Sequence, residues 1–254
     1  MSEHPTHALL FAAGRGERMR PLTATTPKPL LKVGGKPLIV WHLEKLAALG
    51  LREVVINISW LAECFAPALG DGSAWGLRLH LLHEGPEPLE TGGGLLNALP
   101  LLGSKPFLAI AADVWSDVDL HTLPREPAGL AHLLMVANPE HHGAGDFALG
   151  EDGRLHPAAA HAAPGTNTTA AHAAQVLTFS GIGLYRHAFL AGWRDAVGTL
   201  PGAAENPPRF KLRPLFDAAI ARGAISGQRH TGLWADVGSP DRLAALDAAL
   251  SGLR

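Results

Sequence analysis

A turn rich in glycine and arginine follows the first apolar stretch of the chain. It contains Gly14, Arg15, Gly16 and Arg18, and Lys28 follows it between two prolines. Glycine lets backbone N–H groups approach an anion closely because no Cβ intervenes, and the cations add positive charge at fixed places. The turn therefore predicts a site for a polyphosphate. Since neither a third glycine nor a GK[ST] triplet follows, the pattern does not favour a Rossmann dehydrogenase or a Walker-type ATPase.

Two aspartates lie at the ends of predicted strands that are far apart in the sequence. Asp113 follows the apolar stretch 107–112, and Asp236 lies near the end of the stretch 233–237. An open α/β sheet exposes its ligand crevice at the carboxyl ends of its strands, and Mg²⁺ is usually held by one or two carboxylates with water and phosphate oxygens. A single aspartate after a strand is more often a turn or cap residue, so it is the pair that favours a metal site.

The first half of the chain alternates strand-length apolar stretches with segments of helical period. This alternation predicts βα units and a mainly parallel sheet, that is, an α/β fold. Gly50 is expected to end one helix, and Thr91 is expected to cap the start of another. The predicted strands are 8–13, 53–58, 77–82 and 107–112, and the predicted helices are 37–49, 61–69 and 91–99.

The second half is less regular. One segment, 156–174, has no aliphatic side chain larger than alanine, so we expect it to be an exposed mobile loop. Ser239 and Pro240 are typical of a helix start, with serine as the N-cap and proline in the first helical position. The predicted strands are 130–137, 178–185, 225–229 and 233–237, with a hairpin over 146–149 and 154–155, and the predicted helices are 215–222 and 240–250.

The composition excludes several classes of function. A formal net charge of −2 over 254 residues provides no broad basic surface for nucleic acid. The single cysteine, Cys64, cannot form an intramolecular disulfide or ligate an iron–sulfur cluster or zinc ribbon, and it favours the reducing cytoplasm. We expect neither a signal peptide nor a membrane-spanning helix, because no long uncharged apolar run is present.

In order along the chain, these motifs resemble those of the sugar-1-phosphate nucleotidylyltransferases. The resemblance extends from residue 8 to residue 246 and rests on AAGRGERMRPLT at 12–23, PKPL at 27–30, ETGGG at 90–94, DVWSD at 113–117, FSGIGLY at 179–185 and WADVGSP at 234–240. It implies a Rossmann-like three-layer α/β fold with a mainly parallel mixed sheet, of the nucleotide-diphospho-sugar transferase type. It also implies one domain over 1–254, with a nucleotide-binding half at about 7–125 and a sugar-phosphate-binding half at about 126–254.

The resemblance assigns roles to the charged residues. In this family a sugar-1-phosphate oxygen attacks the α-phosphorus of a nucleoside triphosphate and pyrophosphate leaves, so two anionic groups must meet in line. Asp113 and Asp236 match the aspartates that hold Mg²⁺. Lys28 matches the lysine that neutralises the reacting phosphates, and Arg18 matches the arginine that grips the β- and γ-phosphates. These four residues are the catalytic candidates, whereas Arg20 reads equally well as a solvated loop arginine.

The resemblance also implies which residues bind the base and the sugar. The cost of opening a helix with three glycines, about 1 kcal/mol each relative to alanine, suggests a site there. Nucleotide contacts are expected at Ala12, Ala13, Gly14, Arg15, Gly16, Gly92 and Gly93, and sugar-phosphate contacts at Gly145, Ser180 and Gly181. Two positions depart from the family pattern: Ala111–Ala112 stand in place of Asn-Gly, and Ser239 stands in place of threonine.

Within the family, the compact length and the ETGGG and FSGIG motifs most resemble members that use UTP and N-acetylmuramate 1-phosphate in cell-wall recycling. The lactyl carboxylate of that sugar needs a cation, for which Arg209 and Lys211 are the candidates. Two alternatives stay open: another triphosphate such as GTP with a mannose-like sugar phosphate, and a catalytically silent nucleotide-sugar sensor. The expected cofactor is Mg²⁺, and the expected state is a cytoplasmic monomer or small homo-oligomer without nucleic-acid or membrane partners.

Overall fold

The computed structural model describes residues 5–158 and 175–252. Four parallel strands form one side of a mixed sheet in the spatial order β6, β1, β4, β5, with β5 at the edge. Strands β1, β4 and β6 are almost wholly buried, because helices cover both faces of the sheet, and this explains their continuous apolar sequences. The bounds are β1 (His7–Phe11), β4 (Glu53–Ile58), β5 (Arg78–His83) and β6 (Phe107–Ala111).

The long strand β11 (Gln175–Tyr185) joins the C-terminal part of the chain to this parallel core. It runs antiparallel to β6 on one side and to β8 on the other, and β12 lies parallel to β8. A short hairpin of β9 and β10 pairs with the first residues of β11. The bounds are β8 (Ala131–Val136), β9 (Phe147–Leu149), β10 (Leu155–Pro157) and β12 (Ile225–Arg229). The predicted α/β fold with a mainly parallel mixed sheet is thus confirmed.

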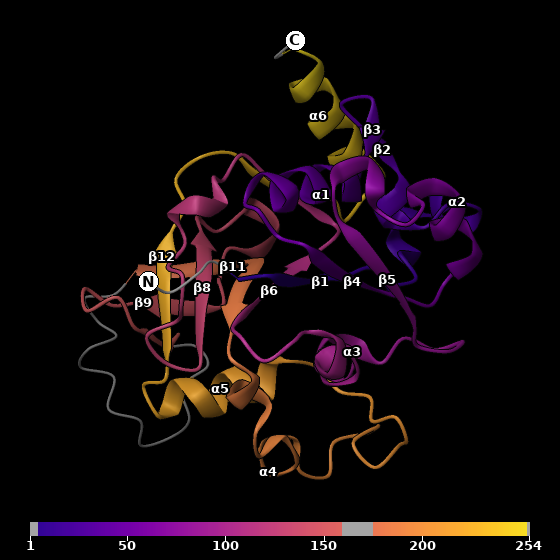
Figure 1. Ribbon diagram of the computed structural model, residues 1–254. Coiled ribbons are helices and arrows are strands. Elements are labelled where there is room, and N and C mark those ends of the chain that lie inside the picture. The colour runs from indigo at the N-terminus through magenta and orange to yellow at the C-terminus, as the bar shows by residue number, and fades with distance from the viewer. Residues whose placement is uncertain (1–4, 159–174, 253–254) are drawn as a thin grey trace.

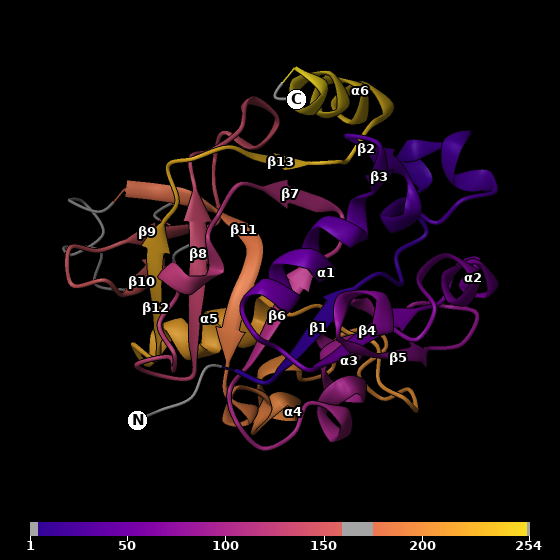
Figure 2. The same ribbon diagram turned by 45° about the horizontal axis from the view of Figure 1, so that its top comes forward.

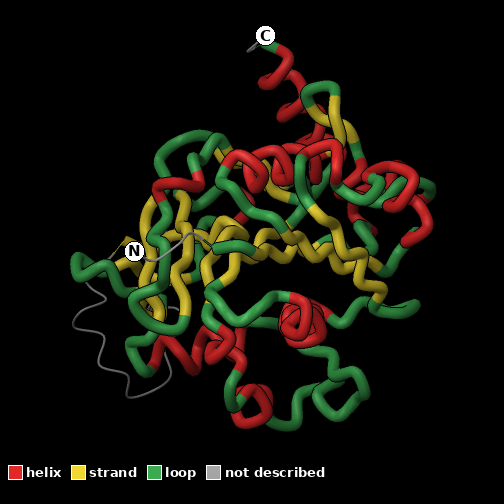
Figure 3. The backbone as a smooth tube through the Cα atoms, viewed as in Figure 1, coloured by secondary structure: helices red, strands yellow, loops and turns green. Residues whose placement is uncertain are grey.

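Helices cover both faces of the sheet (Figures 1 and 3). One face carries α1 (Leu38–Ala48) and the short α2 (Phe65–Leu69), and the other carries α3 (Glu90–Ala98), α4 (Trp193–Val197) and α5 (Arg213–Ala221). Each layer closes its own apolar core, to which α1 and α5 each contribute four fully or nearly fully buried aliphatic or aromatic side chains. No helix among the described residues is long and apolar enough to cross a membrane.

A two-stranded ribbon lies above the carboxyl ends of the central strands. It pairs β7 (Val114–Ser116) with β13 (Trp234–Asp236), and the C-terminal helix α6 (Pro240–Ser251) follows it directly (Figure 2). Helix α6 packs beside a second small ribbon, β2 (Lys32–Val33) with β3 (Lys36–Pro37). A third apolar cluster joins these pieces to the glycine-rich turn through Met19. This cluster therefore connects the N-terminal turn to the C-terminal helix.

Most predicted elements are present, and the exceptions have local causes. Thr91 does not cap α3, which begins at Glu90; its Oγ1 instead accepts the N–H of Leu212 at 3.0 Å. The predicted helix 61–69 is divided into a 3₁₀ turn, Ala62–Cys64, and α2. Ser239 caps α6 as predicted. Of the predicted mobile loop 156–174, residues 159–174 lie outside the described residues, and residues 156 and 157 belong to β10.

Candidate active site

A cavity of about 630 Å³ opens where β1, β4 and β6 end. Its walls come from the glycine-rich turn after β1, from the residues around the start of α3, and from the end of β6 and Asp113. Eight of the residues predicted to form the site line it: Ala12, Ala13, Gly14, Arg15, Gly16, Arg18, Lys28 and Asp113. The structure therefore places the predicted phosphate cradle and one predicted metal ligand around a single space.

The conformation of the glycine-rich turn depends on Gly16 and on its contacts with Thr23. Gly16 has φ +62°, and a Cβ on it would lie 2.9 Å from Cγ2 of Thr23, so only glycine fits. Thr23 Oγ1 donates to the carbonyl of Gly16 at 2.8 Å, and Met19 is buried. These contacts fix the backbone while Arg18 stays exposed beside the cavity.

Arg15 links the turn to the opposite wall through an ion pair with Glu87. Its Nε is buried and has no hydrogen-bond partner. A buried N–H without an acceptor is costly, and Arg15 lines the cavity. An anion in the cavity would satisfy this donor.

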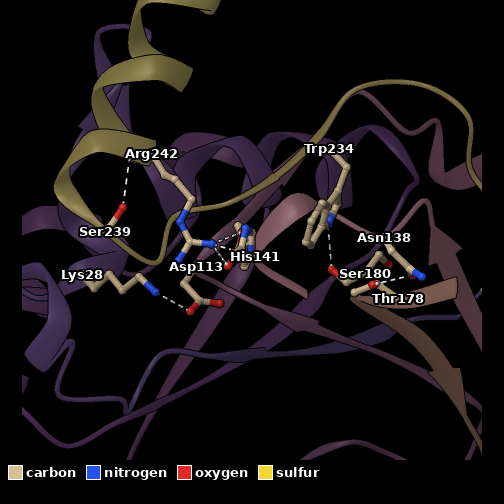
Figure 4. Close-up of polar contacts among 10 residues, drawn as sticks. Lys28, Asp113, Asn138, His141, Thr178, Ser180, Trp234, Ser239 and Arg242 are labelled. Carbon is tan, nitrogen blue, oxygen red and sulfur yellow. Dashed lines mark hydrogen bonds and ion pairs between the residues drawn. The ribbon is translucent and has the colours of Figure 1, made fainter. Parts of the chain in front are cut away.

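Lys28 and Asp113 form an ion pair at the inner end of the cavity. The 3₁₀ turn Lys28–Leu30 buries the lysine between prolines, and its Nζ lies 2.5 Å from Asp113 Oδ2 (Figure 4). The Lys28 side chain is 10% exposed and that of Asp113 is 43% exposed. The lysine is therefore held in place by packing, while the carboxylate keeps an open side for another ligand.

The ribbon brings the second predicted metal ligand to the first. Asp236 lies opposite Val114 in the β7–β13 register, and the N–H of Val237 donates to the carbonyl of Asp113 at 2.8 Å. Both side chains therefore belong to the same end of the ribbon. Asp236 itself is one wall of a neighbouring, mainly apolar cavity of about 340 Å³ below α6.

Asp236 is paired with two basic side chains that the sequence analysis did not identify. Arg242 Nη1 donates to both carboxylate oxygens of Asp236 at 2.7 Å, and His141 Nε2 lies 3.1 Å from Oδ1 (Figure 4). The available sequence signal is weak: an arginine in the first turn of a helix, where the helix dipole disfavours a cation.

A buried polar chain supports the expected base-binding wall. The N–H of Ala12 donates to Asn57 Oδ1 at 2.7 Å, Asn57 Nδ2 donates to Glu84 Oε1 at 2.7 Å, and the N–H of Leu89 donates to Glu84 Oε2 at 2.8 Å. Burial raises the pKa of Glu84. Asn57 and Glu84 both line the cavity. Sequence reasoning missed them, although an asparagine within the apolar strand 53–58 is a usable signal.

The glycines of α3 have a packing role. A Cβ on Gly92 would lie 2.5 Å from the Phe210 ring, and one on Gly93 would lie 2.3 Å from the carbonyl oxygen of Pro208. The N–H groups of both glycines donate to the carbonyl of Phe210. Close approach of the 208–210 segment therefore explains the glycines, and their contact with a base stays a prediction. Just before them, Glu90 has φ +61°, a strained value for a side chain beside a cavity.

The predicted sugar-side residues lie on β11 and on the loop after β8. Gly181, with φ +82°, approaches Ala111 so closely that a Cβ would lie 2.9 Å from the Cβ of the alanine, which places it next to the end of β6. Ser180 is fully buried; its Oγ accepts the N–H of Ile182, and its carbonyl accepts Trp234 Nε1–H (Figure 4). Gly145, with φ +65°, leaves room for the amide of Asn138. Their contact with a sugar stays a prediction.

Arg209 and Lys211 lie beside the start of α3. The guanidinium of Arg209 forms an ion pair with Glu205 at 3.0 Å, and its backbone packs over Gly93. Lys211 is exposed. Neither residue lines the two cavities described above. Their predicted contact with a sugar carboxylate would require Arg209 to leave Glu205.

The comparisons with known proteins agree with this geometry. Residues 7–142 match the family model described as nucleotidyl transferase. The chain belongs to this family. The nucleotidyl transferase is 43% identical, over 93% of its length and 94% of the relative, to an N-acetylmuramate alpha-1-phosphate uridylyltransferase of Neisseria meningitidis serogroup B. It is 32% identical, over 99% of both chains, to a protein of the same name from Caulobacter vibrioides.

A solved structure shows that the fold is shared. A UDP-glucose pyrophosphorylase in complex with UDP-glucose superposes with a TM-score of 0.69 over 98% of this chain and 99% of its own, at 16% identity. The predicted nucleotide-diphospho-sugar transferase fold is therefore confirmed. The family match separately confirms the expectation that this chain is a nucleotidyl transferase.

Proposed function

We propose that this enzyme transfers a uridylyl group from UTP to N-acetylmuramate α-1-phosphate, giving UDP-N-acetylmuramate and pyrophosphate. The observation that carries the chemistry is the Lys28–Asp113 ion pair in the wall of a cavity lined by a glycine-rich turn. The β7–β13 pairing brings Asp236 to the same end of the ribbon as Asp113. The choice of substrates is supported by two relatives that match this chain over nearly its whole length and are named for that activity.

The donor set fits the magnesium ion that the family resemblance implies. Two aspartates at one end of the ribbon supply hard carboxylate oxygens, and each is paired with a cation, Lys28 or Arg242. No cluster of three or more such ligands is present among the described residues, so water and phosphate would complete the shell, as is usual for Mg²⁺. Magnesium bound by Asp113 and Asp236 would neutralise the reacting phosphates and polarise the α-phosphoryl group.

The side chains of the turn perform the remaining electrostatic work. The reaction forms a bond between a phosphate oxygen of the sugar and the α-phosphorus while the bond from that phosphorus to pyrophosphate breaks. Lys28 is buried next to Asp113 and can stabilise charge on the reacting phosphates. Arg18 and Arg15 also line the cavity and are suited to hold the β- and γ-phosphates.

The wall built on Asn57 would orient the base. Its amide holds the backbone of Ala12, and Glu84 holds that of Leu89, so one buried chain fixes the backbone both after β1 and before α3. Rigid backbone groups of this kind provide hydrogen bonds without a loss of side-chain entropy on binding.

The direct test is pyrophosphate release measured with each of the four nucleoside triphosphates and a panel of sugar 1-phosphates. The proposal expects UTP with N-acetylmuramate 1-phosphate to give the highest kcat/KM. Higher kcat/KM with GTP and mannose 1-phosphate would replace the substrates but keep the chemistry. No turnover with any pair, despite nucleotide binding, would support a nucleotide-sugar sensor instead.

Three further expectations belong to this proposal. The single cysteine, Cys64, is compatible with work in the reducing cytoplasm. A monomer or small homo-oligomer is expected, and sedimentation of the purified chain would distinguish them. The chain is also expected to act as one domain, since β11 pairs with strands from both halves.

A further inference from the structure

Arg242 occupies an unusual place for a cation. Ser239 is the N-cap of α6 and accepts the N–H of Arg242, so the arginine lies in the first turn, at the positive end of the helix dipole. Its guanidinium bends back over Gly238, where a Cβ would lie 2.0 Å from Nη2 and 2.8 Å from Cζ. The helix start and the missing Cβ together aim this side chain at Asp236.

Arg242 occupies the place between the two oxygens of Asp236 at which a divalent ion would bind both of them. Arg242 Nη1 lies 2.7 Å from both Oδ1 and Oδ2, so it spans the face of the carboxylate. The Arg242 side chain is only 26% exposed. A cation that is mostly withdrawn from water requires another anion once its carboxylate is engaged elsewhere.

The sugar 1-phosphate would bring such an anion to this place. The cations that line the nucleotide cavity, Arg15, Arg18 and Lys28, all belong to the first 28 residues. On the other side of the two aspartates, the described basic side chains nearest to Asp236 are Arg242 and His141, which lie 2.5 Å apart (Figure 4). His141 belongs to the loop after β8, the loop that also carries Gly145. Figure 4 shows the Arg242 guanidinium and the His141 ring side by side.

We propose that Arg242, flanked by His141, binds the phosphate of the sugar 1-phosphate when Asp236 engages the divalent ion. In the free protein Arg242 keeps the Asp236 carboxylate neutralised. In the substrate complex the guanidinium releases one or both carboxylate oxygens and donates to phosphate oxygens, for which its planar fork is well suited. This inference deepens the proposed function and rests on it.

Equilibrium binding separates this role from simple support of Asp236. Titration calorimetry would measure the Kd of N-acetylmuramate 1-phosphate in the presence of Mg²⁺ and a UTP analogue with a non-cleavable α,β-bridge. We expect Arg242→Met to raise that Kd about tenfold or more, and His141→Gln to raise it by a smaller factor. Arg242→Lys should keep part of the affinity. The matched control, Arg213→Met, removes an arginine paired with a distant aspartate, Asp217, and should change nothing.

Metal binding provides the second measurement. Mn²⁺ used as a spin probe should bind Arg242→Met as tightly as wild type or more tightly, because a competing cation has been removed. Weakened Mn²⁺ binding that parallels the loss of sugar-phosphate affinity would overturn the proposal and make Arg242 a support for Asp236. An unchanged Kd for the sugar phosphate would also overturn it. If Arg242→Met does not fold, Arg242→Lys and His141→Gln provide the same test.

The expected ratio of the two Kd values is independent of which sugar is the substrate. Arg242 and His141 are proposed to bind the phosphate that all sugar 1-phosphates share, so free N-acetylmuramate should bind wild type and Arg242→Met equally weakly. If the wild-type assay identifies another sugar 1-phosphate, the proposed function fails, but the same Kd ratio is expected with that sugar. If N-acetylmuramate 1-phosphate is the substrate and the Kd values of wild type and Arg242→Met are equal, only the proposed role of Arg242 is wrong.

Discussion

The two sides of the active site are built in different ways. On the nucleotide side, one continuous turn supplies the glycines and the cations, and they surround an open cavity of about 630 Å³. On the sugar side, the basic groups come from the loop after β8 and from α6, and Arg242 is held on a carboxylate. On the proposed nucleotide side, Lys28 and Arg15 are also paired with carboxylates, but they already border an open cavity. The proposed sugar-phosphate site forms only when Arg242 leaves Asp236.

Asp113 and Asp236 lie where the two sides meet, so we expect their replacement to lower kcat more than the replacement of any residue on either side. Asp113→Asn and Asp236→Asn should each lower kcat by about a thousandfold or more, because the reacting phosphates lose a charge-bearing metal ligand. The melting temperature should change little, since Asp113 is 43% and Asp236 is 28% exposed. Asp217→Asn, in an exposed pair with Arg213, is the matched control. Turnover near the wild-type rate at saturating Mg²⁺ would remove that aspartate from the metal site.

Within the nucleotide side, Lys28 and Arg18 should differ in kind. Lys28→Ala should lower kcat about a hundredfold and change the KM for UTP less, because the lysine is fixed at the reacting end of the cavity. Arg18→Ala should mainly raise that KM, by about tenfold, since Arg18 is exposed. Arg20→Ala, an exposed neighbour in the turn that does not line the cavity, is the control. The same change in kcat and KM for both variants would contradict the division of roles.

The contrast between the two sides also decides what the sequence could reveal. The glycine-rich turn is local: Gly16, Arg18 and Lys28 act from neighbouring positions, so their motif predicts their roles directly. The predicted strand ends placed Asp113 and Asp236 correctly. Their placement at one end of a ribbon, however, depends on the β7–β13 pairing across more than a hundred residues, and no local pattern specifies that pairing.

The residues that were missed act through distant partners. Asn57 matters because it joins Ala12 to Glu84, and Arg242 matters because Gly238 lets it fold back onto Asp236. The low helix propensity of the three glycines of α3 predicts a binding site, whereas the structure shows close packing of the 208–210 segment against Gly92 and Gly93. Helix propensity indicates only that a residue is locally unfavourable. The contact that compensates for it can be seen only in the tertiary structure.

The buried contact between His42 and β7 makes the stability of the protein depend on pH. His42 on α1 is buried and bonded to the carbonyl of Val114 in β7 at 2.8 Å, and burial lowers its pKa to about 4. The unfolded chain binds this proton near pH 6.5. Stability is therefore lost as the pH falls from about 6.5 towards 4.

Replacement of this histidine should remove that part of the pH dependence. Between pH 7 and pH 5, the free energy of unfolding of wild type should fall by about 2 kcal/mol more than that of His42→Gln, which keeps a donor for Val114. Urea unfolding at the two pH values measures this difference. If the free energy of unfolding changes equally with pH in both proteins, the contact between His42 and Val114 tolerates a protonated histidine.

The smallest effect is expected on the sugar side, where Arg209 and Lys211 were predicted to recognise a carboxylate. Arg209→Ala or Lys211→Ala should raise the KM for N-acetylmuramate 1-phosphate several-fold and leave that for N-acetylglucosamine 1-phosphate unchanged, since only the former sugar carries a carboxylate. Because Arg209 is paired with Glu205, Glu205→Gln should lower the same KM. Equal effects on both sugars would reject carboxylate recognition by this segment.

A double-mutant comparison of Asp113 and Asp236 tests most directly whether the two sides meet in one catalytic centre. Pyrophosphate release at saturating substrates and Mg²⁺ would be measured for Asp113→Asn, Asp236→Asn and the double variant. If the aspartates act as one unit, the double variant should be no more than about threefold slower than the slower single variant. A kcat loss in the double variant equal to the product of the two single losses would show that the aspartates act independently and would contradict a shared centre.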